Sequence, residues 1–189
     1  MKILLLFLCG TLMVACHSRN KADSLSAKIY FTDSDYTHLI PLAENHMQID
    51  EAQHIEASFA EKNFSADSWL QINDSTISIF IFGSFGNTLA EIHYQNDSIS
   101  FNSNVIDPQK VKPEYIIADI QLCFYELSTL KKHYEPAGFS ITEIQKNNET
   151  ERTLTKGSLT IAIISRNKDF LTFKNLLRNY TYQIFFNRT

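Results

Sequence analysis

Apolar and polar residues alternate with a period of two through most of the chain, which is the pattern of β-strands that bury one face. Strands are predicted at residues 54–64, 67–73, 76–82, 89–94 and 99–102, and again at residues 139–144, 153–155, 159–164, 170–174 and 180–186. Clusters of Asn, Asp, Ser and Gly between these segments predict tight turns. The chain is therefore expected to form two runs of antiparallel strands.

The predicted strand at residues 76–82 carries apolar side chains on both of its faces. Ile77, Ile79 and Ile81 point one way, while Phe80 and Phe82 point the other. An antiparallel strand usually keeps one polar face, so we expect apolar groups to cover both of its sides.

A helical segment near residues 113–134 interrupts the strands. Its apolar residues recur at helical spacing, which places them on one face: Ile116, Ile120, Cys123, Leu127 and Leu130. Pro113 favours a helix start, and the cations at 131–133 followed by Pro136 favour an end. A break is expected near Glu126, with Ser128 capping a second short helix. The predicted fold class is α+β: a curved antiparallel sheet that wraps the inserted helical segment.

The first residues predict a lipid anchor. Residues 3–14 form an apolar run that is too short to span a bilayer but fits a signal-peptide core. The run ends in Leu-Met-Val-Ala-Cys16, which resembles the bacterial lipobox. We therefore expect a lipoprotein signal peptide at 1–15, a lipidated Cys16 with a polar tether at 16–26, and one domain at 27–189. The alternative is an ordinary secretory signal cut near Ala15, with Cys16 a chance thiol.

Composition excludes several function classes. The chain has 189 residues and a net charge of -4, which indicates one domain and gives no sign of nucleic-acid binding. Three cysteines without ligand spacing and scattered histidines predict neither a metal site nor a disulfide framework, and no cofactor is expected. Catalytic motifs are absent and no nucleophile–base pair is recognisable, so the protein is not expected to be an enzyme. We interpret Cys123 as a buried apolar residue and leave Asp119 unplaced, without a catalytic role.

Three segments carry a family resemblance. Residues 113–125 resemble "P-E-x-I-L-A-D-L-Q-L-x-[FY]-W", residues 84–94 resemble "P-F-G-x-x-L-x-x-x-x-Y", and residues 171–184 resemble "L-x-L-x-N-x-x-x-x-Y-x-x-x-I". Tyr125 replaces the usual Trp and Ser84 the usual Pro. These motifs are similar to those of a bacterial lipoprotein family of unknown function whose genes are typical of aryl-polyene pigment clusters. That family in turn resembles LolB, the outer-membrane lipoprotein receptor, a half-open antiparallel barrel with helices in its mouth.

The resemblance implies a hydrophobic cargo. We expect a lipid-anchored, non-enzymatic envelope protein that binds a lipid, an aryl-polyene lipid or lipoprotein acyl groups and aids their placement in the outer membrane. His17 after the cysteine favours that membrane by the enterobacterial sorting rule, with the domain facing the periplasm. The candidate lining of the cargo site is Phe80, Phe82, Ile92, Tyr94, Phe101, Phe124, Ile161, Ile163 and Phe173. Two alternatives stay open: these residues form a filled core, or the protein is a ligand-free scaffold for envelope biosynthesis or transport proteins.

Overall fold

The computed structural model describes residues 22–23, 28–59, 62–103, 105 and 112–186. The predicted signal peptide, the lipidated Cys16 and most of the tether lie outside the described residues. Within the tether segment, Ala22 and Asp23 form the short strand β1 (Ala22–Asp23), which pairs with residues Ile99 and Ser98.

The strands form two meanders, one on each side of the helices in the sequence. The first consists of β4 (Ile49–Phe59), β5 (Lys62–Ile72), β6 (Thr76–Phe82), β7 (Thr88–Gln95) and β8 (Ser98–Ser103). The second consists of β9 (Ser140–Lys146), β10 (Glu149–Lys156), β11 (Leu159–Arg166), β12 (Phe170–Asn175) and β13 (Tyr180–Phe186). A separate pair, β2 (Ile29–Tyr30) and β3 (Tyr36–Thr37), precedes them.

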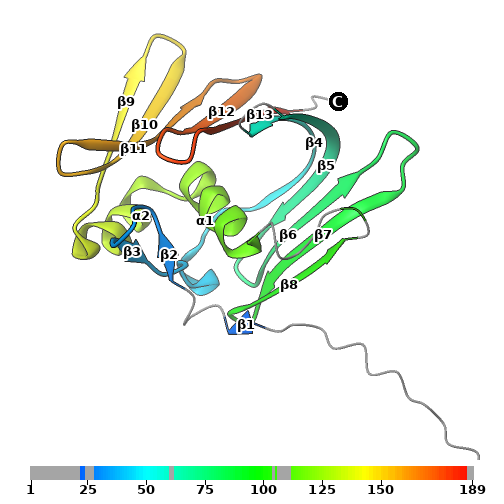
Figure 1. Ribbon diagram of the computed structural model, residues 1–189, viewed down its shortest axis with the longest axis horizontal. Helices are drawn as coiled ribbons and strands as arrows, with labels where there is room; N and C mark the ends of the chain where they lie inside the picture. The colour runs from blue at the N-terminus through cyan, green and yellow to red at the C-terminus, as the bar shows by residue number, and fades with distance from the viewer. Residues whose placement is uncertain (1–21, 24–27, 60–61, 104, 106–111, 187–189) are drawn as a thin grey trace, which may run out of the picture.

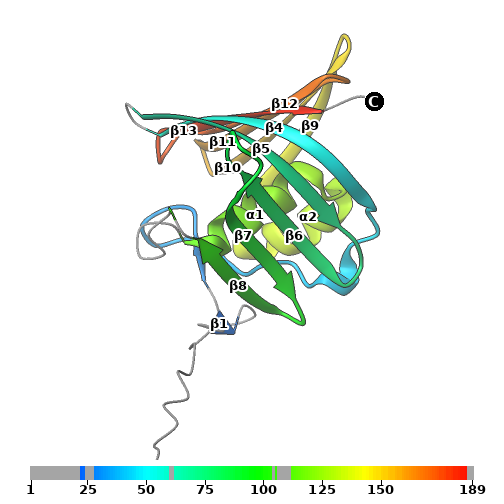
Figure 2. The same cartoon turned by 90° about the vertical axis from the view of Figure 1, so that its right-hand side faces the viewer.

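The two meanders join into one 11-stranded sheet in the order β1-β8-β7-β6-β5-β4-β13-β12-β11-β10-β9. The joint is the antiparallel pair of β4 and β13, the first strand of one meander and the last strand of the other. The sheet curves around the helices, as Figure 1 and Figure 2 show. The expected α+β architecture, an open curved antiparallel sheet with helices against it, is therefore present.

The helical insert consists of α1 (Pro113–Phe124) and α2 (Leu127–Tyr134), followed by the 3-10 turn η2 (Glu135–Ala137). The expected break is confirmed, but the predicted cap is wrong. Glu126 occupies the N-cap position of α2 and makes no side-chain cap bond, whereas the Ser128 hydroxyl donates to Glu126 Oε2 at 3.5 Å. Every residue from Ile117 to Phe124 is buried. The first helix is therefore enclosed on all sides along these residues, as the apolar Ile117 and Phe124 beside the main stripe favour.

The strand predictions are accurate where the turn residues are distinctive. Strands β6 and β13 have the predicted bounds. The predicted strand at 54–64 is wrong, because β4 ends at Phe59 and β5 begins at Lys62, with these two residues opposite each other. The intervening sequence Ala60-Glu61 has none of the Gly, Pro, Asn or Asp residues that mark a hairpin.

The two faces of β6 are covered differently. Ile77 and Ile79 are buried on the inner face, which we define as the side of the sheet that faces the helices. On the outer face, Phe80 lies opposite Trp69 and contacts the His93 ring at 5.2 Å between centroids. Trp69 is 41% exposed, so the outer side carries cross-strand aromatic contacts rather than the second apolar layer that the sequence predicted.

Candidate functional site

Two polar side chains lie inside the molecule on α1. Asp119 is 6% exposed and Gln121 is 1% exposed, although both belong to the buried part of the helix. A buried carboxyl or amide is costly unless it is hydrogen-bonded. The partners of these two side chains therefore define how α1 is held against the rest of the chain.

Asp119 contacts β13, the strand that joins the second meander to β4. The hydroxyl of Tyr180 on β13 donates to Asp119 Oδ2 at 2.6 Å, and Asn175 Nδ2 on β12 donates to the Tyr180 hydroxyl at 3.2 Å. The Tyr182 hydroxyl also acts on the Asp119 carboxyl, because it lowers the pKa of that group. The Tyr182 ring stacks on Phe173 with centroids 4.8 Å apart and planes 6° apart. Aromatic residues of β12 and β13 thus surround the carboxyl.

Burial raises the pKa of Asp119 to about 7, against the lowering effect of the Tyr180 and Tyr182 hydroxyls and of the nearby Arg178 charge. Burial, together with the Asp119 carboxyl, also raises the pKa of the Tyr180 and Tyr182 hydroxyls. The tyrosines therefore remain neutral donors, and Asp119 is the group in this cluster that changes its charge near neutral pH.

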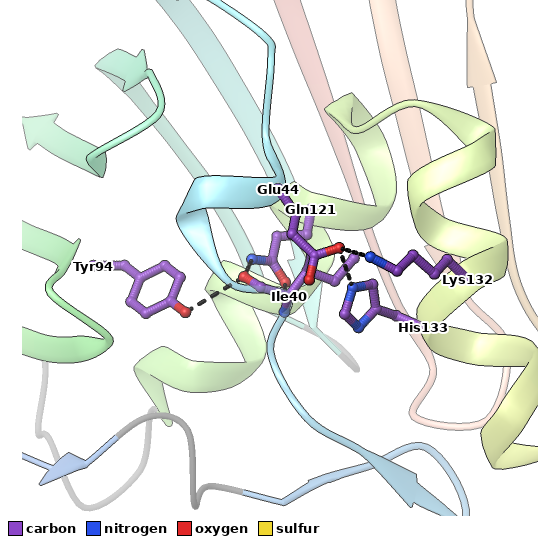
Figure 3. A network of polar contacts seen from close by, with 6 residues as sticks. All are labelled: Ile40, Glu44, Tyr94, Gln121, Lys132 and His133. Carbon is purple, nitrogen blue, oxygen red and sulfur yellow. Dashed lines mark hydrogen bonds and ion pairs between the residues drawn. The ribbon is translucent and has the colours of Figure 1, made fainter.

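Gln121 holds a distant segment of the chain. The Ile40 N–H donates to Gln121 Oε1 at 3.0 Å, and Gln121 Nε2 donates to the Ile40 carbonyl at 2.8 Å, so one side chain satisfies both backbone groups of one residue. The Tyr94 hydroxyl on β7 donates to the same carbonyl at 3.4 Å (Figure 3). The segment around Ile40, which we call the strap (residues 39–45), is thereby fixed between α1 and the sheet.

The other end of the strap contacts α2. Glu44, in the 3-10 turn η1 (Leu42–Glu44), accepts from Lys132 Nζ at 2.6 Å and lies 3.0 Å from His133 Nε2 (Figure 3). These contacts lower the pKa of Glu44, with the Lys132 bond contributing most. The strap therefore connects both helices.

A hollow of about 220 Å³ lies at the end of α1, against β9, β10 and β11. Its lining combines two guanidinium groups with apolar and polar residues: Cys123, Phe124, Glu143, Thr150, Arg152, Ile164 and Arg166. Arg152 is 9% exposed, pairs with Glu143 at 2.7 Å and donates to the carbonyl of Leu122 at 2.5 Å. After the bond of Asp119 to Tyr180, this is a second polar contact that holds α1 to the sheet.

A family model described as "Protein of unknown function (DUF3261)" matches residues 50–186. The chain belongs to the DUF3261 family. The matched region runs from β4 to β13 and so contains both meanders, both helices and the contacts of Asp119 and Arg152 that hold α1. The partners of Gln121 on the strap, and Tyr30 of β2, whose N–H donates to the Tyr115 hydroxyl, lie outside it. No curated protein matches this DUF3261 chain.

The structure places the predicted lining residues on both sides of the sheet. Four are buried on the inner side or on α1 (Ile92, Tyr94, Phe124 and Phe173), and Phe101, opposite Ile92, packs against the same core. Ile161 is also fully buried. By strand alternation and register, Phe80, Phe82 and Ile163 lie on the outer face, so the nine residues of the DUF3261 chain do not line one surface.

Three polar residues whose spacing in the sequence indicates no common site lie together on the outer face. The Ser65 hydroxyl lies 3.1 Å from His54 Nε2, and His54 Nδ1 lies 2.8 Å from Asp67 Oδ1. The hydrogen bonds link the three residues in the order serine, histidine, carboxylate, as in a catalytic triad. The sequence alone showed no nucleophile–base pair. The Asp67 side chain is 72% exposed, so solvent screens its charge, in contrast to the water-excluded sites in which such sets act.

Sequence analysis of this DUF3261 chain left Asp119 unplaced and missed Gln121, Arg152 and Arg166. The sequence does contain a sign of Asp119 and Gln121, because a carboxylate and an amide in an otherwise apolar helix need buried hydrogen-bond partners. In the described residues, no cluster of three or more His, Cys, Asp or Glu side chains could hold a metal ion. Neither helix there has the length and apolar character to cross a bilayer.

Proposed function

We propose that this protein is a lipid-anchored, non-enzymatic carrier of the bacterial envelope. It binds a hydrophobic chain, such as a lipid, an aryl-polyene lipid or lipoprotein acyl groups, on the inner side of a LolB-like curved sheet and aids its placement in the outer membrane. The anchor rests on the lipobox that ends at Cys16. Two or more acyl chains on one cysteine attach a protein stably, whereas one chain binds reversibly.

The enclosure of α1 is the observation that carries the proposal. The helix is buried from Ile117 to Phe124 within a sheet that is open at both edges, and it covers apolar side chains of both meanders. An acyl chain that replaced the helix would cover the same apolar surface. Polar bonds at Asp119, Gln121 and the Leu122 carbonyl hold α1 in place, and water can satisfy each of these groups when the helix moves.

Native mass spectrometry of a secreted form that begins at His17, purified from a bacterial host without detergent, tests this function. We expect a population heavier than the polypeptide by one lipid, which organic extraction removes and added lipid restores. The delipidated sample is the matched control. If only the polypeptide mass appears, and added dodecanoate or phospholipid produces no heavier species, the carrier function is wrong.

A second function is favoured by the packing of the interior. Tyr94, Tyr125, Tyr134 and Phe173 are fully buried, so the space between helices and sheet is filled in this conformation. The outer face, in contrast, exposes Trp69 beside Phe80. The corresponding function is a ligand-free scaffold for envelope or aryl-polyene biosynthesis proteins. A lipid-free mass spectrum, combined with loss of partner binding in Trp69→Ser, would favour it.

A further inference from the structure

Arg166, at the end of β11, is positioned like an anion-binding group. Its guanidinium carbon lies 5.5 Å from the ring centre of Phe124 and 5.2 Å from that of Phe186. Aromatic contacts of this kind orient a guanidinium and leave its N–H edges available for a planar acceptor. In the part of the chain that the structure describes, Arg166 has no ion-pair partner, and its side chain is exposed.

The other charged residues of the hollow are already paired. Glu143 Oε2 accepts from Arg152 Nε at 2.9 Å and pairs with Arg152 Nη2 at 2.7 Å. The remaining Nη1 of Arg152 donates to the Leu122 carbonyl. Two guanidinium groups and one carboxylate leave the lining with one net positive charge, and that charge belongs to Arg166. Both guanidinium groups line the same hollow as Cys123.

Apart from Thr150, the uncharged residues of the lining are apolar. Cys123, Phe124 and Ile164 belong to the hydrophobic core. The volume of about 220 Å³ is below the ~300–1,000 Å³ of sites that enclose a drug-sized ligand. The hollow therefore accommodates a small anionic group and the first carbons of a chain, and the rest of the chain reaches the apolar interior when α1 moves aside.

We propose that this hollow binds the carboxylate or phosphate head of a single-chain amphiphile, with Arg166 as the bidentate donor and the chain directed into the core. This inference rests on the carrier function and adds the chemical class of its ligand. Arg–carboxylate and Arg–phosphate pairs are among the strongest hydrogen-bonded contacts in proteins. A neutral chain of the same length lacks this contact and is expected to bind more weakly.

Protection of Cys123 from N-ethylmaleimide tests the site directly, because the thiol lines the hollow. The full chain is held in phosphatidylcholine nanodiscs, and alkylation of the Cys123 peptide is followed by mass spectrometry. The probes are dodecanoate, dodecyl phosphate, 1-dodecanol and inorganic phosphate. We expect the two anionic amphiphiles to slow alkylation at concentrations at which dodecanol and inorganic phosphate do not.

Two substitutions that each remove one positive charge separate recognition from general electrostatics. Arg166→Gln should raise the half-protecting concentration of dodecanoate about tenfold or more. Lys174→Gln, on the outer face of β12, should leave it unchanged, and Arg166→Lys should fall between them. Each rate is compared with that of the same variant without probe, because Arg166 also affects the reactivity of the Cys123 thiol.

The outcomes distinguish the two proposals. If dodecanol protects as well as dodecanoate and Arg166→Gln has no effect, the head-group site is wrong and the carrier function stands. If inorganic phosphate alone protects as well as dodecyl phosphate, the hollow is a free-anion site and the amphiphile is wrong. If no probe protects Cys123 and none is retained by the chain, both proposals fall.

Discussion

At the scale of single residues, Asp119 shows how a polar group can hold an element in place at a cost. Its carboxyl accepts a hydrogen bond from Tyr180 on β13, yet burial outweighs this bond and raises its pKa to about 7. The folded protein therefore binds a proton that the unfolded chain, with an ordinary aspartate pKa of 3.8, has already lost. The contact specifies where α1 lies, and its contribution to stability depends on pH.

The sign of that dependence can be measured. Below about pH 4 the carboxyl is protonated in both states, and between about pH 4 and 7 only the folded state retains the proton, so stability falls as pH rises. The slope is up to about 1.4 kcal/mol per pH unit. Asp119→Asn should lose this slope in urea unfolding between pH 4 and 8 and be the more stable protein at pH 8. Asp74→Asn, in an exposed turn, is the control, and an unchanged slope in Asp119→Asn would contradict the assignment.

At the scale of elements, the sequence predicted the helical insert and most strands because their patterns are local. The spacing of apolar residues in 113–134 and the Asn-Asp-Ser and Asn-Asn turns depend on neighbouring residues alone. The strap was not predictable in this way. Its bond to Gln121 joins residues 81 positions apart, and residues 39–42 have no period that indicates a partner. The placement of α1 depends on such long-range polar contacts, which no local pattern encodes.

Gln121 should therefore be important for stability although it is a polar residue on a helix. Gln121→Ala leaves the buried Ile40 N–H without its acceptor, while the Ile40 carbonyl keeps the Tyr94 hydroxyl. Loss of a buried partner costs roughly 1–3 kcal/mol, so we expect the free energy of unfolding in urea to fall by that amount. Gln95→Ala, at an exposed strand end, should change it by less than about 0.5 kcal/mol. Equal effects of the two substitutions would show that the strap is not held by this bond.

At the scale of the whole molecule, the pairing of β4 with β13 decides the shape, and the sequence could not predict it. The turn residues predict the strand order within each meander. The joint between β4 and β13, however, pairs residues such as Ile55 and Ile184 that are far apart in the chain. The same limit explains the candidate lining. Apolar strands 76–82 and 159–164 were identified, yet which of their faces meets the helices follows only from the curvature of the joined sheet. The candidate lining therefore contains Phe80, Phe82 and Ile163, although these residues lie on the outer face.

The proposed lipid anchor is tested on the full-length chain. In a bacterial host given a clickable palmitate analogue, the wild-type chain should incorporate the label and lose residues 1–15. Cys16→Ala should incorporate none and keep the mass of the precursor, because the acylated thiol is also the cleavage determinant of a lipobox. Cys9→Ala, within the signal-peptide core, removes the other N-terminal thiol and should behave as wild type. Equal labelling of Cys16→Ala would mean that the acyl chain is attached at another residue. Cleavage of the wild-type chain near Ala15 without any label would mean that the domain is secreted without a lipid.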